Sequence, residues 1–263
     1  MNNSLYIAAT GMQAQQLGLD TIANNLTNLN TPGYKASNVN FQELMYADPV
    51  GARQATGHDA VQAAATPFGS GVSVANVSKD FSLGTLTQTG SPMDIAIQGG
   101  GFFEVTLPDG SHAYTRGGTF RVSKDNFLTG PQGYEIKPSI RLPNNMTGLT
   151  ITASGQVMVT TTTSTQPNAV GQIELASFSN PGALSPLGDG TYLPTEASGA
   201  ASYGKPGDAN TGTLAQGSLE GSNVNMVTQM VDMMVVQRAY ELSAKVIQTS
   251  DEIMSMTNNL RRS

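Results

Sequence analysis

The sequence contains no cysteine, which excludes disulfides, thiolate metal sites and thiol nucleophiles. Histidine is almost as scarce, and neither His58 nor His112 has a neighbour at metal-ligand spacing. No Gly-x-Ser-x-Gly elbow or phosphate-binding glycine motif occurs. The glycines of QGGGFF at 98–103 precede a predicted strand, which favours a bulge or a close strand approach. The sequence therefore predicts a protein that is not an enzyme and that holds no cofactor or metal.

Positive charge is also sparse, with 13 Lys and Arg against 19 Asp and Glu and no basic run. This excludes the electrostatic footprint of a nucleic-acid-binding protein. The start, MNNSLYIAATGMQAQQ, has neither the basic region nor the apolar region of a cleaved signal peptide. No segment is apolar enough to span a bilayer. We expect no nucleic-acid partner, no membrane insertion and, if the protein is exported, a route without a cleaved signal peptide.

What the sequence does contain is a seven-residue apolar repeat near its amino terminus, typical of one face of a packed helix. The repeat predicts a helix of about 25 residues. Thr31-Pro32-Gly33-Tyr34 should end it, because proline and glycine at these positions favour a type II turn. The residues expected to pack against other helices are Leu5, Met12, Leu19 and Leu26, with Ile22 and Leu29 from the row beside them.

A second repeat near the carboxyl end predicts one helix from about 222 to 260, capped by Ser222 or Asn223 and carrying a Glu241–Lys245 pair. Six of the twelve methionines lie between 226 and 256. Two such helices alone would leave apolar surface in water, and methionine adapts well to non-identical contacts. We therefore expect packing with helices of neighbouring subunits, through Met226, Met230, Met233, Tyr240, Ile247 and Met254.

Four asparagines crowd the end of the first predicted helix, in ANNLTNLNTPGYK at 23–35. They fall between the stripe positions, where a solvated helix would normally carry Glu or Lys. Uncharged amides can form hydrogen bonds without the desolvation cost of a charge. We expect this face to press against other subunits or to line a channel.

The middle of the chain consists of short apolar alternations separated by turn residues. PDG at 108–110 and ASGQ at 153–156 each lie between two such runs and predict β-hairpins, and a later strand is expected near 173–178. The stretches 47–71 and 196–213 are rich in Ala, Gly, Ser and Pro, which favours linkers or extended arms.

Together these patterns predict an α+β fold. Long amino- and carboxyl-terminal helices pack as a discontinuous coiled-coil-like domain, and an antiparallel all-β domain is inserted between them. The expected boundaries are a helix and turn at 1–46, an extended arm at 47–75, the β domain at 76–195, a linker at 196–218 and the second helix at 219–263.

Four segments resemble the bacterial flagellar rod and hook family. ANNLTNLNTPGYK at 23–35 and LEGSNVNMVTQMVDMMVVQRAYELSAKVIQTSDEIM at 219–254 are similar to its paired terminal signatures. SPMDIAIQGGGFFEV at 91–105 and HAYTRGGTFRV at 112–122 are similar to its β-domain core. The length of the chain and VGQIELASFSNPGAL at 170–184 favour the distal-rod type, with a proximal-rod paralogue or a hook-type subunit as the alternative.

The resemblance implies a structural subunit that polymerises with its own copies into a hollow helical drive shaft, carrying torque from motor to hook. It implies contacts with other rod subunits, with hook or hook-side axial proteins and with the surrounding basal-body rings. It also implies export by the flagellar type III apparatus and a location in the rod that crosses the periplasm toward the outer membrane. The arm at 47–71 would stiffen the shaft. Outside this family, a stalked β-rich adhesin or binding module is the alternative.

Overall fold

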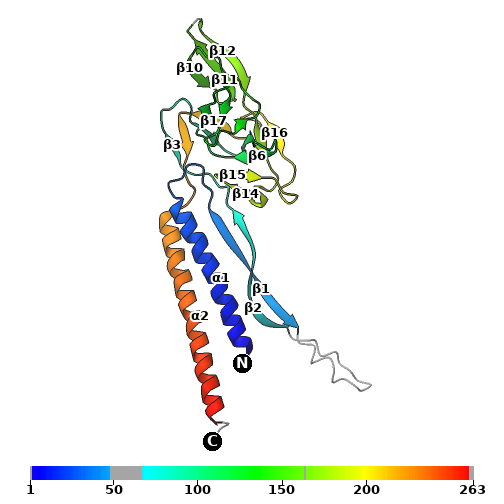
Figure 1. The fold of residues 1–263 in the computed structure, drawn as a ribbon, viewed down its shortest axis with the longest axis vertical. Helices are drawn as coiled ribbons and strands as arrows, with labels where there is room; N and C mark the ends of the chain where they lie inside the picture. The colour runs from blue at the N-terminus through cyan, green and yellow to red at the C-terminus, as the bar shows by residue number, and fades with distance from the viewer. Residues whose placement is uncertain (1, 48–66, 163, 261–263) are drawn as a thin grey trace, which may run out of the picture. The chain divides into compact units, whose positions relative to one another are not determined.

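The computed structural model describes residues 2–47, 67–162 and 164–260, which form two compact units (Figure 1). The helical unit comprises the chain up to residue 26, residues 37–78 and the chain from residue 226. The β unit comprises residues 27–36 and 79–225. His58 and residues 48–66 of the predicted arm lie outside the described residues.

The helical unit contains two long helices and a two-stranded antiparallel hairpin. Helix α1 spans Asn2–Thr27, helix α2 spans Met226–Leu260, and strands β1 and β2 span Ser37–Ala47 and Pro67–Lys79. Both helices were predicted from their apolar repeats and are confirmed. Among the described residues, no helix combines the length and hydropathy that a membrane crossing requires.

The hairpin was not predicted, because residues up to 46 were assigned to the helix and turn, and 47–75 to an extended arm. Two glycines and a proline weaken the strand signal of PFGSGVSVANVSK despite its three valines, so strand propensity alone does not hold the hairpin. Cross-strand polar pairs hold it instead: Asn40 Nδ2 donates to Asn76 Oδ1 at 2.7 Å, and Gln42 Nε2 donates to Ser73 Oγ at 3.0 Å.

The turn after α1 has the predicted geometry. Gly33 has φ of 71°, and the Tyr34 amide donates to the Thr31 carbonyl at 3.2 Å, as a type II turn requires. Helix α2 begins at Met226, later than predicted, because the Asn223 side chain bonds to Ala36 and Asp80 and does not cap the helix.

The β unit contains a seven-stranded sheet in the order β14-β15-β6-β5-β9-β8-β7, a three-stranded sheet β10-β11-β12, and the pairs β17–β4, β18–β3 and β13–β16 (Figure 1). The strands and the short 3-10 helix η2 are β3 Leu86–Gln88, β4 Ile95–Gln98, β5 Phe103–Thr106, β6 His112–Thr115, β7 Arg121–Val122, β8 Leu128–Thr129, β9 Glu135–Ile136, β10 Met146–Ile151, β11 Gln156–Thr161, β12 Ser164–Gln172, β13 Leu175–Ser177, η2 Pro181–Ala183, β14 Ser185–Gly188, β15 Thr191–Leu193, β16 Ser202–Gly204, β17 Thr213–Gln216 and β18 Ser218–Glu220.

Both predicted hairpins are confirmed. Strands β5 and β6 pair across the PDG turn, and β10 pairs with β11 so that Leu149 lies opposite Val159. Their inward side chains, among them Phe103 and Val105, share one hydrophobic core with Leu149 and Val159. The core therefore joins the seven-stranded and three-stranded sheets.

The predicted linker at 196–218 is wrong, because it contains strands β16 and β17 and the start of β18. Strand β17 pairs with β4, and β18 pairs with β3, more than a hundred residues earlier in the chain. Nearby, the predicted close approach at QGGGFF is confirmed: Gly99 has φ of 124°, and a Cβ on it would lie 2.8 Å from Gly212 Cα.

A second, smaller core of the β unit is aromatic. Phe81, Phe102, Phe178, Tyr114 and Tyr192 contact one another edge to face, with ring centroids 4.8–6.4 Å apart. Burial raises the pKa of Tyr192 to about 12. The pKa of Tyr114 is also raised, by burial and by the 3.1 Å hydrogen bond with the Tyr203 hydroxyl.

The β unit should therefore lose stability in alkali. Below pH 10 both the folded and the unfolded chain keep the Tyr192 proton; between pH 10 and about 12 only the folded chain keeps it, so the free energy of unfolding falls. Tyr192 should contribute a loss of up to about 2 kcal/mol across this range. Urea unfolding of the protein and of Tyr192→Phe from pH 8 to 11.5 measures it. Equal pH slopes for the two proteins would contradict the assignment.

Candidate functional sites in the helix pair and the buried junction

The two helices pack antiparallel along a seam of small residues (Figure 1). A Cβ on Gly11 would lie 3.7 Å from Ser243 Oγ, and one on Gly18 would lie 3.8 Å from Val236 Cγ1. Farther along, Asn25 Nδ2 donates to Gln229 Oε1 at 3.1 Å. The contacts recur every seven residues in opposite directions on the two helices, so a heptad register holds the pair.

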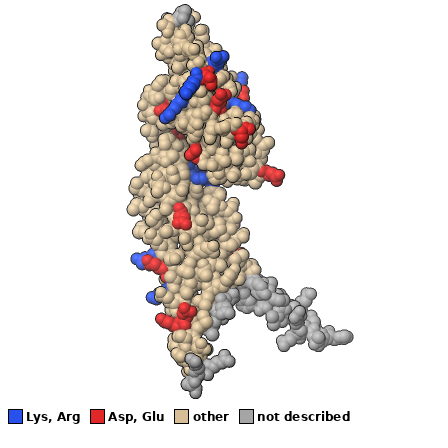
Figure 2. Space-filling model, viewed as in Figure 1, with Lys and Arg blue, Asp and Glu red and all other residues tan. Residues whose placement is uncertain are grey.

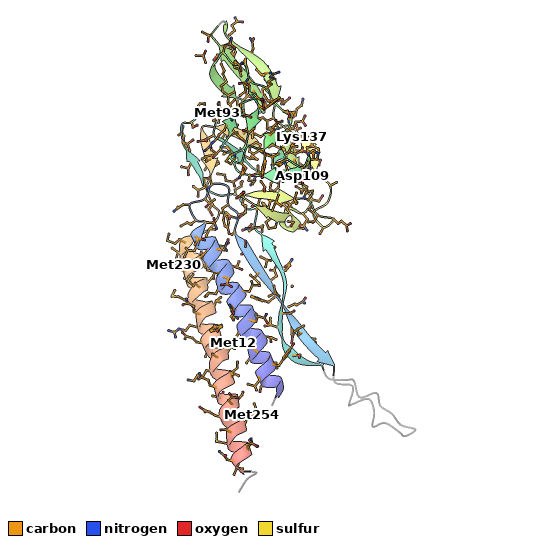
Figure 3. The ribbon with its side chains drawn as sticks, viewed as in Figure 1. Met12, Met93, Asp109, Lys137, Met230 and Met254 are labelled. Carbon is orange, nitrogen blue, oxygen red and sulfur yellow. The ribbon has the colours of Figure 1, made fainter. Side chains whose placement is uncertain are left out.

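The seam lies one position before the predicted stripe on α1. Of the predicted packing residues, Leu5, Met12, Leu19, Ile22, Leu26, Leu29, Met233, Ile247 and Met254 are half-buried within one chain, whereas Met226, Met230 and Tyr240 are exposed. Figure 3 shows Met12 on α1, and Met230 and Met254 on α2. Small residues at heptad spacing indicate the seam in the sequence. The predicted stripe does not include them, because it consists of large apolar residues, and Gly11 and Gly18 are not among those. Contact of the stripe with other subunits stays a prediction.

Helix α2 exposes an apolar face on the side away from the seam. We call this the α2 apolar face; it consists of Val227, Val231, Met234, Val235, Leu242, Val246, Ile253, Met256 and Leu260. Their spacing places them in one stripe at 3.6 residues per turn, and Val227 and Leu242 are 72% and 65% exposed. Figure 2 shows that charged side chains occupy only a few places on the visible surface of the helices. An apolar stripe of this length marks an interaction surface.

Charged side chains interrupt this face, because Arg238, Lys245 and Glu252 follow Val231 at seven-residue intervals. Glu241 forms its ion pair with Arg238, at 2.8 Å, and not with Lys245 as the spacing predicted. Both side chains are mostly exposed, so the pair adds little stability.

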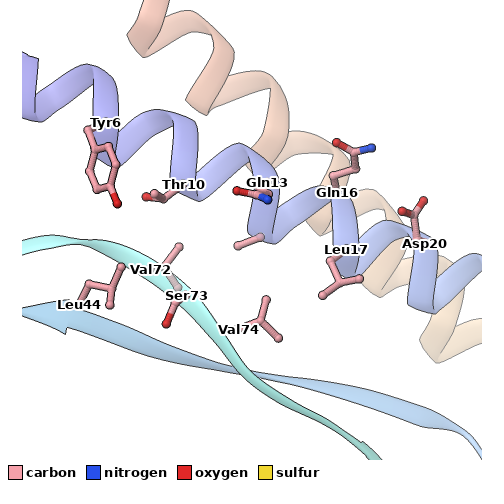
Figure 4. Close-up of a pocket in the computed structure, with 11 residues that line it drawn as sticks. Tyr6, Thr10, Gln13, Gln16, Leu17, Asp20, Leu44, Val72, Ser73 and Val74 are labelled. Atoms are coloured by element: carbon pink, nitrogen blue, oxygen red, sulfur yellow. The ribbon is translucent and has the colours of Figure 1, made fainter.

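The opposite side of α1 faces the hairpin (Figure 4). Tyr6, Thr10 and Leu17 lie over Val72 and Val74 of β2 and border an open groove. Its described lining has Asp20 as its single carboxylate. Helix α1 thus lies between α2 and the hairpin. The groove has no pair of acid and base groups for catalysis among its described lining residues.

Asn25 joins three segments of the helical unit. Its side chain is buried, its Oδ1 accepts a bond from the Ser37 amide at 2.8 Å, and its Nδ2 donates to the Ser37 carbonyl at 2.9 Å as well as to Gln229. Asn25 therefore acts as a strand partner for the first residue of β1 while it contacts α2. This corrects the expectation that all the asparagines face other subunits or a channel.

Replacing Asn25 with leucine should detach β1 from the helices. Both polar groups of Ser37 would lose a buried partner, at a cost of about 3 kcal/mol to the helical unit. Hydrogen exchange of the β1 amides in the full chain measures the effect. Asn30→Leu, at an exposed position in the following turn, is the matched control. Unchanged exchange at Ser37 in the Asn25 variant would refute the role.

The β unit has a buried junction where its two chain ends meet. The Gly33 amide donates to the Glu220 carbonyl at 2.7 Å, and a Cβ on Gly33 would lie 3.1–3.2 Å from the backbone of Arg116 and Gly117. Three of the quoted sequence signatures therefore meet at this point. Gly33 is required there both for its positive φ and for its missing side chain.

Charged side chains fill the junction. Lys35 Nζ lies 2.6 Å from Glu220 Oε1, and Arg116 Nη1 lies 3.5 Å from the same oxygen; all three side chains are at most 2% exposed. Arg116 also donates to the carbonyls of Gly99 and Gly101. Burial lowers the pKa of Lys35 and of Arg116, and the charge of Glu220 opposes that shift.

Sequence reasoning identified Pro32 and Gly33 as a turn but missed the ionic residues beside it. The signal was Lys35 itself, because Asp20 is the only charged residue before it. The other predicted sites hold no such network. His112 Nδ1 lies 3.1 Å and Lys137 Nζ 3.3 Å from Glu104 Oε1, and no group of three metal-ligating side chains occurs in the described part of the chain.

Three family models match the chain. "Flagella basal body rod protein" matches residues 5–35, "Flagellar hook protein FlgE/F/G D1 domain" matches 96–159, and "Flagellar basal body rod FlgEFG protein C-terminal" matches 215–260. The curated relatives include the flagellar basal-body rod protein FlgG of Borreliella burgdorferi, 40% identical with all of both chains covered. The FlgG proteins of Caulobacter vibrioides, 40% identical over 98% of this chain and 99% of the relative, and of Bacillus subtilis, 33% identical over all of both, are also similar.

Proposed function

This chain belongs to the flagellar basal-body rod protein family as a structural, non-enzymatic subunit of the distal-rod type, and from that premise we propose that its copies build a hollow helical shaft. The shaft passes torque from the motor toward the hook. The observation that carries the proposal is the α2 apolar face, which one chain leaves exposed along most of a 35-residue helix.

Burial of that face against neighbouring copies supplies the free energy of assembly. Val227 and Leu242 are more exposed than any residue that the sequence analysis singled out on α2, so they extend the predicted packing set. The half-buried stripe residues, such as Met12 and Met233, flank the seam and complete the contact between subunits. Small residues in the seam let α1 and α2 approach closely, and the stripe residues beside the seam stay partly exposed for contact with other subunits.

The family places the subunit in the basal-body rod, where it polymerises with rod or hook subunits. The finer assignments are part of the proposal: contact with hook-side axial proteins and the surrounding rings, and export by the flagellar type III apparatus. Stiffening of the shaft by the arm at 47–71 is proposed as well. Deleting residues 48–66 tests it through the straightness of assembled shafts.

Electron microscopy of basal bodies tests the proposed function directly. A strain lacking this chain should produce truncated rods without hooks and should not swim, and the full chain expressed in trans should restore both. Complete rods in the deletion strain would reject the assignment to the shaft. Tubes formed by the purified chain would show that the homopolymer needs no other subunit.

A further inference from the structure

A buried ion pair between residues 185 positions apart lies where the two ends of the β unit meet. We propose that Lys35 and Glu220 form a latch that completes the fold of the β unit only when both of its chain ends are in place, and that fixes the register in which they enter. We call this pair the end latch. The proposal goes beyond the function in the shaft and stands without it, because one chain contains every group involved.

The buried ammonium of Lys35 needs Glu220 as its counter-charge. Lys35 is among the largest side chains that the described residues bury completely, and its Nζ donates to Glu220 Oε1 and to the Ser82 carbonyl, each at 2.6 Å. A buried ammonium without a counter-charge is strongly disfavoured. The segment before β1 therefore docks stably only when Glu220 is in position.

Glu220 depends equally on both ends. Its Oε1 also accepts a bond from the Gly84 amide at 3.0 Å, and its carbonyl accepts one from Gly33 at 2.7 Å. Arg116 is a weaker partner at 3.5 Å, since its guanidinium already binds the carbonyls of the glycine-rich loop. Without Lys35, Glu220 keeps its contact with the β unit but loses its nearest cation.

The strands beside the latch are short, although hydrogen bonds from Thr89 and Gly90 to Gly217 and from Gly221 to Thr85 extend their pairing. Strands β3 and β18 have three residues each, and the side chains of β3 are exposed. Their pairing closes a loop of more than a hundred residues, which costs chain entropy before any contact compensates for it. The latch lies directly at the end of this pair, at Glu220, so it stabilises the closure of the loop.

The charge of Lys35 also specifies register. A packed apolar cluster can be as stable as a buried ion pair, so stability alone does not require charge here. The flanking residues Tyr34 and Ala36 are uncharged, and a shift of one position would leave Glu220 without Lys35. The Asn223 side chain adds a second constraint, because its Oδ1 accepts the Ala36 amide at 2.8 Å.

Hydrogen exchange and refolding of the full chain test the end latch. In Lys35→Met, amides of β3 and β18 should exchange about a hundredfold faster, while those of β10 and β11 keep their protection. Refolding from urea should slow at least tenfold. Lys79→Met is the matched control: Lys79 is half-buried in the same region, its Nζ bonds to the Lys35 carbonyl at 3.0 Å, and its pKa is also lowered by burial, but it does not pair with Glu220.

A double-mutant cycle separates the pair from general damage. Glu220→Gln keeps an acceptor for Gly84, and Lys35→Met/Glu220→Gln should exchange more slowly than the sum of the single effects predicts. Additive effects, or equal exchange in the Lys35 and Lys79 variants, overturn the latch. Failure of Lys35→Met to fold while Lys79→Met folds supports the latch. Glu220→Gln must then show fast exchange confined to β3 and β18. Normal exchange of these strands in Glu220→Gln overturns the latch.

Discussion

Replacing Gly118 with alanine should unfold the β unit. A Cβ on Gly118 would lie 2.0 Å from the Ile95 carbonyl oxygen and 2.9 Å from its carbon. Neither backbone segment can move away, because the Ile95 amide donates to the Gly118 carbonyl at 2.9 Å and the Ile95 side chain is fully buried in the main core. The two backbones must separate by more than 1 Å, which costs about 4 kcal/mol or more.

Urea unfolding followed by circular dichroism measures this loss. Gly130→Ala is the matched control, since a Cβ there would make ordinary contacts with the end of Gln132, at 3.5 Å, and the Tyr134 carbonyl oxygen, at 3.9 Å; its stability should change by no more than about 1 kcal/mol. Equal midpoints for the two variants would show that the contact between Gly118 and Ile95 is not as close as described. Unfolding of Gly118→Ala would also remove the Arg116 side of the buried junction, two residues away.

Val235→Glu should abolish shaft assembly and leave the single chain folded. Val235 is 62% exposed on the α2 apolar face, so a carboxylate there is solvated in the monomer. In the polymer it would be buried without a partner, at a cost of several kcal/mol per subunit. The concentration needed for polymerisation should rise at least a hundredfold, and cells with only this variant should not swim.

Sedimentation and electron microscopy of the purified variant check the assembly, and circular dichroism checks the fold. Val235→Leu keeps this position apolar, and it should assemble normally. Met233 is a less informative site, because it is half-buried within one chain and a charge there would also disturb the helix pair. Normal shafts from Val235→Glu would exclude the α2 apolar face as the contact between subunits.

The β unit begins earlier than the sequence indicated. Residues 27–36 belong to it through Gly33 and Lys35, although they were assigned to the amino-terminal helix and turn. A truncation after residue 46, at the predicted end of the helix and turn, would remove Lys35, the cation of the buried junction. The boundaries between the two units fall after residues 26, 36, 78 and 225.

The sequence alone determined the two terminal helices, the turn at Pro32-Gly33, two central hairpins and the lack of catalytic motifs. Each of these is a local property: a periodicity, a turn dipeptide or an absent residue type can be read within about 20 positions. The family resemblance came from the same local segments. Composition further predicted that nucleic acid is not a partner, because net charge does not depend on the fold.

Only the tertiary structure decided which residues join these elements. Gly11 and Gly18 form the helix seam because their small size matters only opposite a second helix more than 200 residues away. Asn25 is buried because β1 and α2 both reach it. Lys35 and Glu220 pair across 185 residues, and nothing in ANNLTNLNTPGYK identifies Glu220 as the partner of its lysine. Burial of a small, amide or charged side chain is set by distant partners, whose positions are fixed only when the long-range strands close.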